Sequence, residues 1–174
     1  SLFLQSAAFF LFFLIISTTI SLPISYYSVF TIEEKYGFNK TTKITFLIDK
    51  IKGLLMSLII GGFILFVSIQ IYILFGANFW LWLWLFLSVF LILTNMFYTT
   101  LIVPIFNKLS PLEEGSLKNK IEEYSKKIGY SLDKIFVIDG SKRSSKANAF
   151  FSGLGPKKTI ALFDTLIDKH EEDE

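Results

Sequence analysis

The fold is decided by residues 53–107, GLLMSLIIGGFILFVSIQIYILFGANFWLWLWLFLSVFLILTNMFYTTLIVPIFN, a run of 55 residues without one charged side chain. About 20 apolar residues cross the hydrocarbon core of a bilayer as a helix, so this run is too long for one crossing. Small and turn-prone residues interrupt it at Gly76-Ala77-Asn78. The pattern therefore predicts a helical hairpin with arms at about residues 53–75 and 79–103, and Pro104 is expected to end the second arm.

A second charge-free run, residues 1–32, predicts one further span at about residues 2–20. This run begins at full hydrophobicity, without an initiator Met or a basic segment, which favours an internal fragment over a signal peptide. We therefore expect an α-helical polytopic membrane protein with three transmembrane helices, and a hydrophobic fraction of 52% excludes a small soluble domain. Gly61-Gly62 in the first hairpin arm predicts the close approach of a neighbouring helix.

The charged residues lie outside these runs, in the loop of residues 32–52 and in residues 108–174. Loops rich in Lys stay on the cytoplasmic side of a membrane, so both segments are expected in the cytoplasm and residues 76–78 on the opposite side. The sequence contains no Cys, which excludes disulfide and thiol chemistry. A net charge of +2 argues against a nucleic-acid partner, and the lack of ionisable groups such as Asp or Lys in the predicted spans argues against an ion-coupled transporter.

Residues 108–174 predict a small α+β segment with one helix and three short strands. Ser110-Pro111-Leu112-Glu113 has the pattern of a helix start, with a restart at Ser116 as the alternative, and Gly129 is expected to end the helix. Runs of β-branched and aromatic residues predict strands at 134–138, 147–151 and 159–163. The apolar positions of the helix recur at helical spacing and are expected to pack on this sheet: Leu117, Ile121, Tyr124 and Ile128.

The single histidine, His170, tests the hydrolytic and metal hypotheses. It opens His170-Glu171-Glu172-Asp173-Glu174, which differs from H-E-x-x-H at the fifth position and is better interpreted as a solvated acidic helix start. A catalytic zinc needs three protein ligands, which one His does not provide, and no G-x-S-x-G elbow is present. We therefore expect no catalytic residue, no metal ligand and no bound cofactor in this chain.

Two segments extend the interpretation. Residues 33–42, EEKYGFNKTT, and residues 139–151, DGSKRSSKANAFF, resemble the CAAX prenyl protease family of integral-membrane zinc metalloendopeptidases. Residues 104–108, PIFNK, and 160–166, IALFDTL, look like further landmarks of that family in the same order. The resemblance covers roughly residues 23–166 with gaps, and the combination of motifs is specific where each alone is weak.

The resemblance implies seven membrane helices around a large chamber and a zinc site built from H-E-x-x-H plus a later Glu. The zinc helix would begin just after Glu174, so zinc belongs to the full-length protein and this fragment is expected to be inactive alone. The membrane region is expected at residues 1–107, and residues 108–174 are expected to be the N-terminal part of a cytoplasmic peptidase domain. The implied partners are a lipid bilayer and a peptide or protein substrate, prenylated at a CAAX terminus or otherwise membrane-associated.

The resemblance implies that the role of this fragment is substrate alignment. Asn148, Ala149 and Phe150 match the strand that binds an extended peptide in related metalloproteases, with the Asn148 amide available to a peptide carbonyl. The alternative is an ordinary inner hairpin strand. Lys146 stands where relatives often have His, and Arg143, with the neighbouring Lys142, either meets a substrate carboxylate or is only hydrated.

Asn39 and the basic loop around it are expected near the site, from resemblance only. A rival from another class is a non-catalytic membrane scaffold or receptor with a cytoplasmic partner-binding domain, which explains the hydropathy but not both motifs. An H-E-x-x-H within about one helix length downstream of Glu174 would separate the two hypotheses in favour of the protease.

Overall fold

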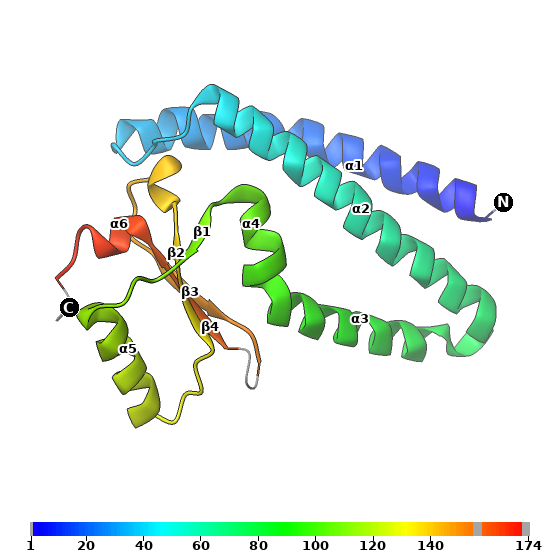
Figure 1. Cartoon of the computed structure of the whole chain (residues 1–174). Coiled ribbons are helices and arrows are strands. Elements are labelled where there is room, and N and C mark those ends of the chain that lie inside the picture. The colour runs from blue at the N-terminus through cyan, green and yellow to red at the C-terminus, as the bar shows by residue number, and fades with distance from the viewer. Residues whose placement is uncertain (1, 155–157, 172–174) are drawn as a thin grey trace. The chain divides into compact units, whose positions relative to one another are not determined.

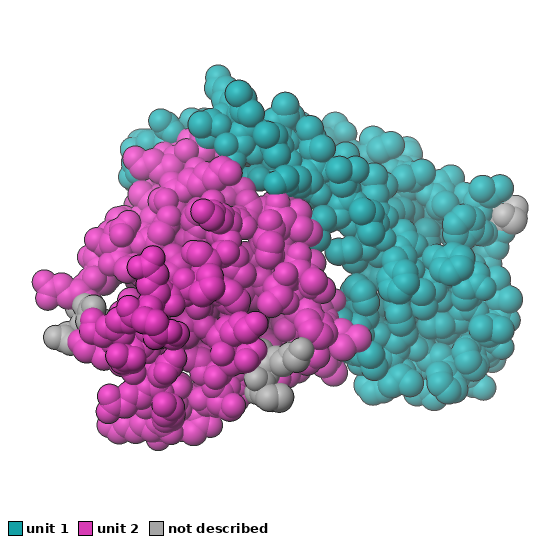
Figure 2. All heavy atoms as spheres, in the orientation of Figure 1, with its two compact units in different colours: residues 1–37, 42–90 teal, residues 38–41, 91–174 magenta. Residues whose placement is uncertain are grey.

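The computed structural model describes residues 2–154 and 158–171, and its chain divides into two compact units (Figure 1). Unit 1 holds the residues up to 37 together with residues 42–90, and unit 2 holds residues 38–41 together with those from 91 onward (Figure 2). The short segment 38–41 thus belongs to a different unit from the residues on either side of it.

Unit 1 is helical. Its helices are α1 (Leu2–Tyr27), the π-helical η1 (Ser28–Glu33), α2 (Lys43–Phe75), the 3-10 turn η2 (Gly76–Asn78) and the first part of α3 (Phe79–Phe97). Within the described residues, two continuous helical stretches are long and apolar enough to cross a membrane, Leu2–Glu33 and Lys43–Phe106. The second stretch contains η2 and makes two apolar arms, so the expected helical membrane architecture is confirmed.

The hairpin of α2 and α3 turns at Gly76, which has a φ of +50°. A left-handed φ suits glycine because it has no Cβ. Aromatic rings then hold the arms together: Phe75 stacks on Trp82 with ring centroids 4.5 Å apart, and Phe63 lies 6.2 Å from Phe90. The predicted break at residues 76–78 is confirmed.

A glycine also shapes the packing of α1 on α2. A Cβ on Gly61 would lie 2.6 Å from Cζ of Phe10, so the ring of Phe10 occupies the space that the missing side chain leaves. A Cβ on Gly62 would meet nothing within 4 Å. The expected close approach is therefore confirmed at Gly61 and not at Gly62.

Two helices of unit 1, α1 and α2, extend beyond the predicted apolar spans. The first helix passes through Pro23 and continues as η1 to Glu33. Helix α2 already begins at Lys43, where the hydroxyl of Thr42 accepts a hydrogen bond from the backbone N–H of Thr45 at 3.1 Å. A side-chain acceptor at this position satisfies one of the free N–H groups of the first turn, which explains the early start.

Unit 2 contains a four-stranded mixed sheet in the order β1-β2-β4-β3. Its strands are β1 (Leu109–Pro111), β2 (Lys134–Ile138), β3 (Ala149–Ser152) and β4 (Thr159–Phe163). Strands β2 and β4 are parallel, whereas β1 and β3 run antiparallel to their neighbours at the two edges. The strands at 134–138 and 159–163 are confirmed, and the third is shifted from the predicted 147–151 to Ala149–Ser152. Part of its predicted link to β4, residues 155–157, lies outside the described residues.

The predicted helix start at Ser110-Pro111-Leu112-Glu113 is wrong. These residues begin in β1, and the backbone N–H of Leu112 donates to the carbonyl of Ile135 at 2.9 Å. Proline is tolerated here because β1 is an edge strand. Helix α5 (Ser116–Lys127) begins at the alternative position, Ser116.

The interpretation of the apolar stripe on α5 is also wrong in part. Tyr124 is 65% exposed and Ile128 is 56% exposed, whereas the buried residue of the helix is Ser125. Gly129 has a φ of +69°, which confirms its predicted role as the left-handed stop. The helix lies beside the sheet in Figure 1. The exposure of Tyr124 and Ile128 shows that part of its apolar face is uncovered.

The core of unit 2 joins the sheet to the short helix that follows α3 and η3. After α3 come the π-helical η3 (Tyr98–Ile102) and the short α4 (Val103–Phe106). Val103, Ile138 and Ala161 form the buried cluster, and partly buried apolar side chains pack against it: Leu109, Phe150 and Phe163. Pro104 does not end the helix as predicted, because the helical stretch continues through η3 and α4 to Phe106, with Pro104 in the first turn of α4.

Candidate functional site

The outer edge of β3 is the site that the sequence singled out. The carbonyl of Asn148 accepts the backbone N–H of Phe163 at 3.0 Å, and the register pairs Ala149 with Leu162. In an antiparallel ladder, hydrogen-bonded and non-hydrogen-bonded pairs alternate. The backbone N–H and C=O groups of Ala149 and Phe151 therefore point away from β4, toward the edge that no described strand covers.

Asn148 lies at the entrance to this edge, one residue before β3. Its side chain is exposed, and its Oδ1 atom accepts the backbone N–H of Ala149 at 2.9 Å. The amide thus occupies the first outward-pointing N–H of the strand. Ala149 is exposed as well, so the structure brings two of the three predicted residues to the open edge.

Phe150, the third predicted residue, points the other way. Its ring is half-buried and makes edge contacts with the rings of Tyr98, at 5.9 Å, and Phe163, at 6.4 Å. Its partner across the ladder is Ala161. Phe150 therefore holds the strand on the core, while its neighbours present the edge.

The loop that leads into β3 is fixed by residues after β4. Asp164, the first residue of α6 (Asp164–Ile167), accepts the backbone N–H of Ser141 at 2.8 Å, and the hydroxyl of Thr165 donates to the carbonyl of Lys146 at 2.8 Å. The ammonium of Lys146 lies 5.0 Å from the ring centroid of Phe38, a cation–π distance. The segment 160–166 thus supports the segment 139–151 by direct hydrogen bonds.

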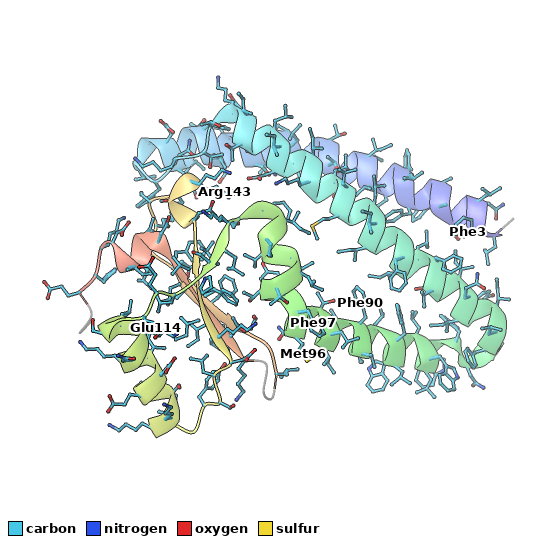
Figure 3. The ribbon with its side chains drawn as sticks, viewed as in Figure 1. Phe3, Phe90, Met96, Phe97, Glu114 and Arg143 are labelled. Carbon is cyan, nitrogen blue, oxygen red and sulfur yellow. The ribbon has the colours of Figure 1, made fainter. Side chains whose placement is uncertain are left out.

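Arg143 follows the short helix η4 (Gly140–Lys142) and lies beside α4 (Figure 3). Its Nη2 atom donates to the carbonyl of Phe106 at 2.6 Å, and the side chain is half-buried. A cation at the C-terminus of a helix satisfies a free carbonyl and complements the helix dipole. The structure therefore gives Arg143 a capping role, which neither of the two interpretations from the sequence contained.

Residues 38–41, which we call the strap, pair with the same loop. The backbone N–H of Lys40 donates to the carbonyl of Arg143 at 3.0 Å, and the N–H of Ser145 donates to the carbonyl of Phe38 at 3.0 Å. Asn39 and Ser144 form an antiparallel bridge. The two sequence segments on which the family resemblance rests are thus bonded to each other, and Asn39 lies close in space to the loop that enters β3.

The described residues do not supply a zinc site. Among residues 2–154 and 158–171, no group of three or more His, Cys, Asp or Glu side chains could hold a metal ion. His170 is exposed beyond α6, and residues 172–174 of the predicted acidic helix start lie outside the described residues.

Away from the site, the hydrogen bond to Glu114 raises the pKa of Lys118.

The apolar helices and the mixed sheet define the class of protein: a polytopic membrane protein with a small α+β segment. Residues 1–108 match the family described as CAAX prenyl protease N-terminal, five membrane helices, and residues 111–174 match peptidase family M48. The chain belongs to the CAAX prenyl protease family of M48 peptidases. The resemblance noted in the sequence is therefore confirmed.

Relatives agree over most of the chain. CAAX prenyl protease 1 of Saccharomyces cerevisiae is 47% identical over 160 residues, 91% of this chain and 35% of the relative. Probable CAAX prenyl protease 1 of Schizosaccharomyces pombe is 45% identical, over 91% of this chain and 33% of the relative. The crystal structure of S. mikatae Ste24p superposes with a TM-score of 0.89 at 46% identity, covering 95% of this chain and 39% of that one. The chain thus spans about a third of the length of these curated relatives.

Proposed function

We propose that this chain forms the membrane and substrate-alignment part of a membrane-embedded zinc metalloendopeptidase. The complete enzyme processes CAAX-type prenylated peptides or other membrane-associated peptides. In this proposal, zinc is held by residues that follow Glu174 in the complete protein; among residues 2–154 and 158–171, no group of three or more His, Cys, Asp or Glu side chains could hold a metal ion. The family membership supports the protease hypothesis over the scaffold or receptor hypothesis. The scaffold or receptor hypothesis explains only the apolar helices.

The observation that carries the proposal is the free edge of β3. An extended peptide adds to such an edge through main-chain hydrogen bonds, which give affinity independently of the peptide's sequence. Ala149 and Phe151 supply the outward backbone groups, and the Asn148 side chain lies beside the first of them. In the proposed complex, the Asn148 amide turns from the Ala149 N–H to the peptide and donates through Nδ2 to a peptide carbonyl.

The role of Asn148 is testable in the full-length polypeptide. Asn148→Ala is expected to lower kcat/KM for a farnesylated CAAX peptide by roughly tenfold, the equivalent of one hydrogen bond of about 1.4 kcal/mol. Bound zinc, measured by metal analysis of the purified protein, is expected to stay unchanged. Asn148→Asp is the matched variant, because it keeps the Oδ1 acceptor and removes the Nδ2 donor.

If the donor matters, the Asp variant loses as much turnover as the Ala variant. Unaltered turnover in both variants would remove Asn148 from the site. A full-length polypeptide that is purified intact and holds no tightly bound zinc would contradict the enzymatic proposal itself.

The proposed orientation places the loop of residues 32–52 and residues 108–174 in the cytoplasm. The support is the cation asymmetry, since Lys35, Lys40, Lys43, Lys50 and Lys52 lie in that loop and the tip at residues 76–78 carries no charge. A single Cys introduced at Ala77 is therefore expected to be protected from a membrane-impermeant thiol reagent added on the cytoplasmic side, because the natural chain has no Cys to compete. A Cys at Lys40 is the control and should be labelled from that side, and ready labelling at Ala77 would reject the topology.

A further inference from the structure

The π-helical turn η3, at the end of the third apolar helix, presents two neighbouring side chains to β3. The ring of Tyr98 meets the ring of Phe150 edge to face, and the hydroxyl of Thr99 is hydrogen-bonded to the hydroxyl of Ser152. Phe150 and Ser152 lie two residues apart in a strand, so their side chains share one face of the sheet. The turn thus holds β3 on both sides of Phe151.

The hydroxyl pair is buried. Thr99 is 2% exposed and Ser152 is 6% exposed. In a buried setting each hydroxyl needs a partner, and here one hydroxyl donates to the other in the single bond between them. Removing one partner therefore leaves the other unsatisfied, whereas removing both leaves no polar group to satisfy.

Other hydroxyls in the apolar helices make a different kind of bond. Thr19 donates to the carbonyl of Ile15 at 2.8 Å, and Thr100 donates to the carbonyl of Phe97 at 3.2 Å, each within its own helix. Such bonds are local and fix nothing outside the helix. The hydroxyl of Thr99 instead reaches a strand 53 residues away. A π-helical turn is rare and is often found at a functional position, which fits this use of η3.

We infer that Thr99 and Ser152 are positioning residues that set where the free edge of β3 lies, and that the third apolar helix thereby fixes the alignment of the bound peptide. The inference rests on the proposed function, because it requires that the peptide adds to this edge. Strand β3 has four residues and, among the described residues, one neighbouring strand, so its position depends on the contacts made by its inner face. The outward groups of Phe151 move whenever Phe150 or Ser152 moves.

The test compares four variants of the full-length polypeptide with a farnesylated CAAX peptide as substrate. Thr99→Val keeps the shape and removes the hydroxyl, and it is expected to raise KM about fivefold to tenfold with little change in kcat, in line with the loss of one hydrogen bond. Thr99→Ser keeps the hydroxyl and is expected to restore the native KM. Thr100→Val is the matched control and is expected to behave as the native protein, because Thr100 is exposed and bonds only within its helix.

The double variant Thr99→Val with Ser152→Ala separates positioning from stability. Both hydroxyls are absent from the double variant, so no unsatisfied hydroxyl remains and the thermal midpoint is expected to recover toward the native value. KM is expected to stay raised, because the hydrogen bond that links the helix to the strand is gone. A KM that recovers together with the midpoint would overturn the inference, and so would an unchanged KM in Thr99→Val.

Failure of the inference is distinguishable from failure of the proposed function. If Asn148→Ala lowers turnover and Thr99→Val does not change KM, the edge binds the peptide and the helix does not position it. If changes at the edge itself leave turnover untouched, the peptide binds elsewhere and both proposals fall.

Discussion

Replacing Phe151 with proline should lower kcat/KM of the full-length polypeptide for a peptide substrate by roughly tenfold to hundredfold, because it removes the backbone N–H that the strand offers to the peptide. The substitution leaves the ladder with β4 intact, since the N–H of Phe151 points to the open edge. Proline is tolerated at such a position of an edge strand. The side chain is 75% exposed, so its loss does not open the core.

Phe151→Ala is the matched control for the backbone. It removes the same ring and keeps the N–H, so turnover is expected to stay within about threefold of the native value, the usual range of a surface substitution. Equal losses in the two variants would assign the effect to the ring. Native turnover in the proline variant would show that the peptide does not use this edge.

Gly140→Ala is expected to destabilise unit 2 by about 1–3 kcal/mol, the typical cost of overpacking a core. An added Cβ would lie well inside van der Waals contact with Cδ1 of Phe163, and 3.0 and 3.1 Å from its Cε1 and Cγ atoms. The ring of Phe163 packs on the buried cluster and on Phe150, so it cannot move without disturbing β3. Thermal unfolding of the detergent-solubilised full-length polypeptide measures the change.

Gly115→Ala is the matched control for Gly140. A Cβ there would meet nothing within 4 Å, and the φ of 172° is extended backbone that any residue adopts. The midpoint of this variant is expected to stay the same or rise slightly, because alanine restricts the unfolded chain. Combining Gly140→Ala with Phe163→Leu should recover part of the loss, and equal midpoints for Gly140→Ala and the native protein would contradict the steric explanation.

Local patterns predicted most of the elements. The charge-free runs predicted the apolar helices, and Gly76 and Gly129 predicted a turn and a helix end, because both signals depend on residues close together in sequence. The capping pattern at Ser110 was misleading because the structure there depends on residues that are far apart in sequence. Its N-terminal part pairs with β2, where Pro111 lies opposite Phe136, 25 residues further along the chain, and tertiary pairing overrides a local propensity.

The site was only partly accessible from the sequence. Asn148 and Ala149 were singled out by resemblance, but the outward direction of Phe151 depends on the ladder register with β4, which no local pattern encodes. Thr99 was missed because a hydroxyl in an apolar helix usually bonds to its own backbone. The capping role of Arg143 was missed because its partner, the carbonyl of Phe106, ends a short helix that the sequence did not predict.

The strap also constrains the order of events during synthesis. The hydroxyl of Thr41 donates to the carbonyl of Arg143, a partner 102 residues further along the chain. At about 5–20 residues per second, the ribosome needs roughly 5 to 20 s to make those residues. The hairpin of α2 and α3 lies between the strap and Arg143, so it has been translated in full before the strap can bind the loop that contains Arg143. The pairing of strap and loop is therefore a late step of biogenesis. Its loss is expected to affect the protein after membrane insertion and not during it.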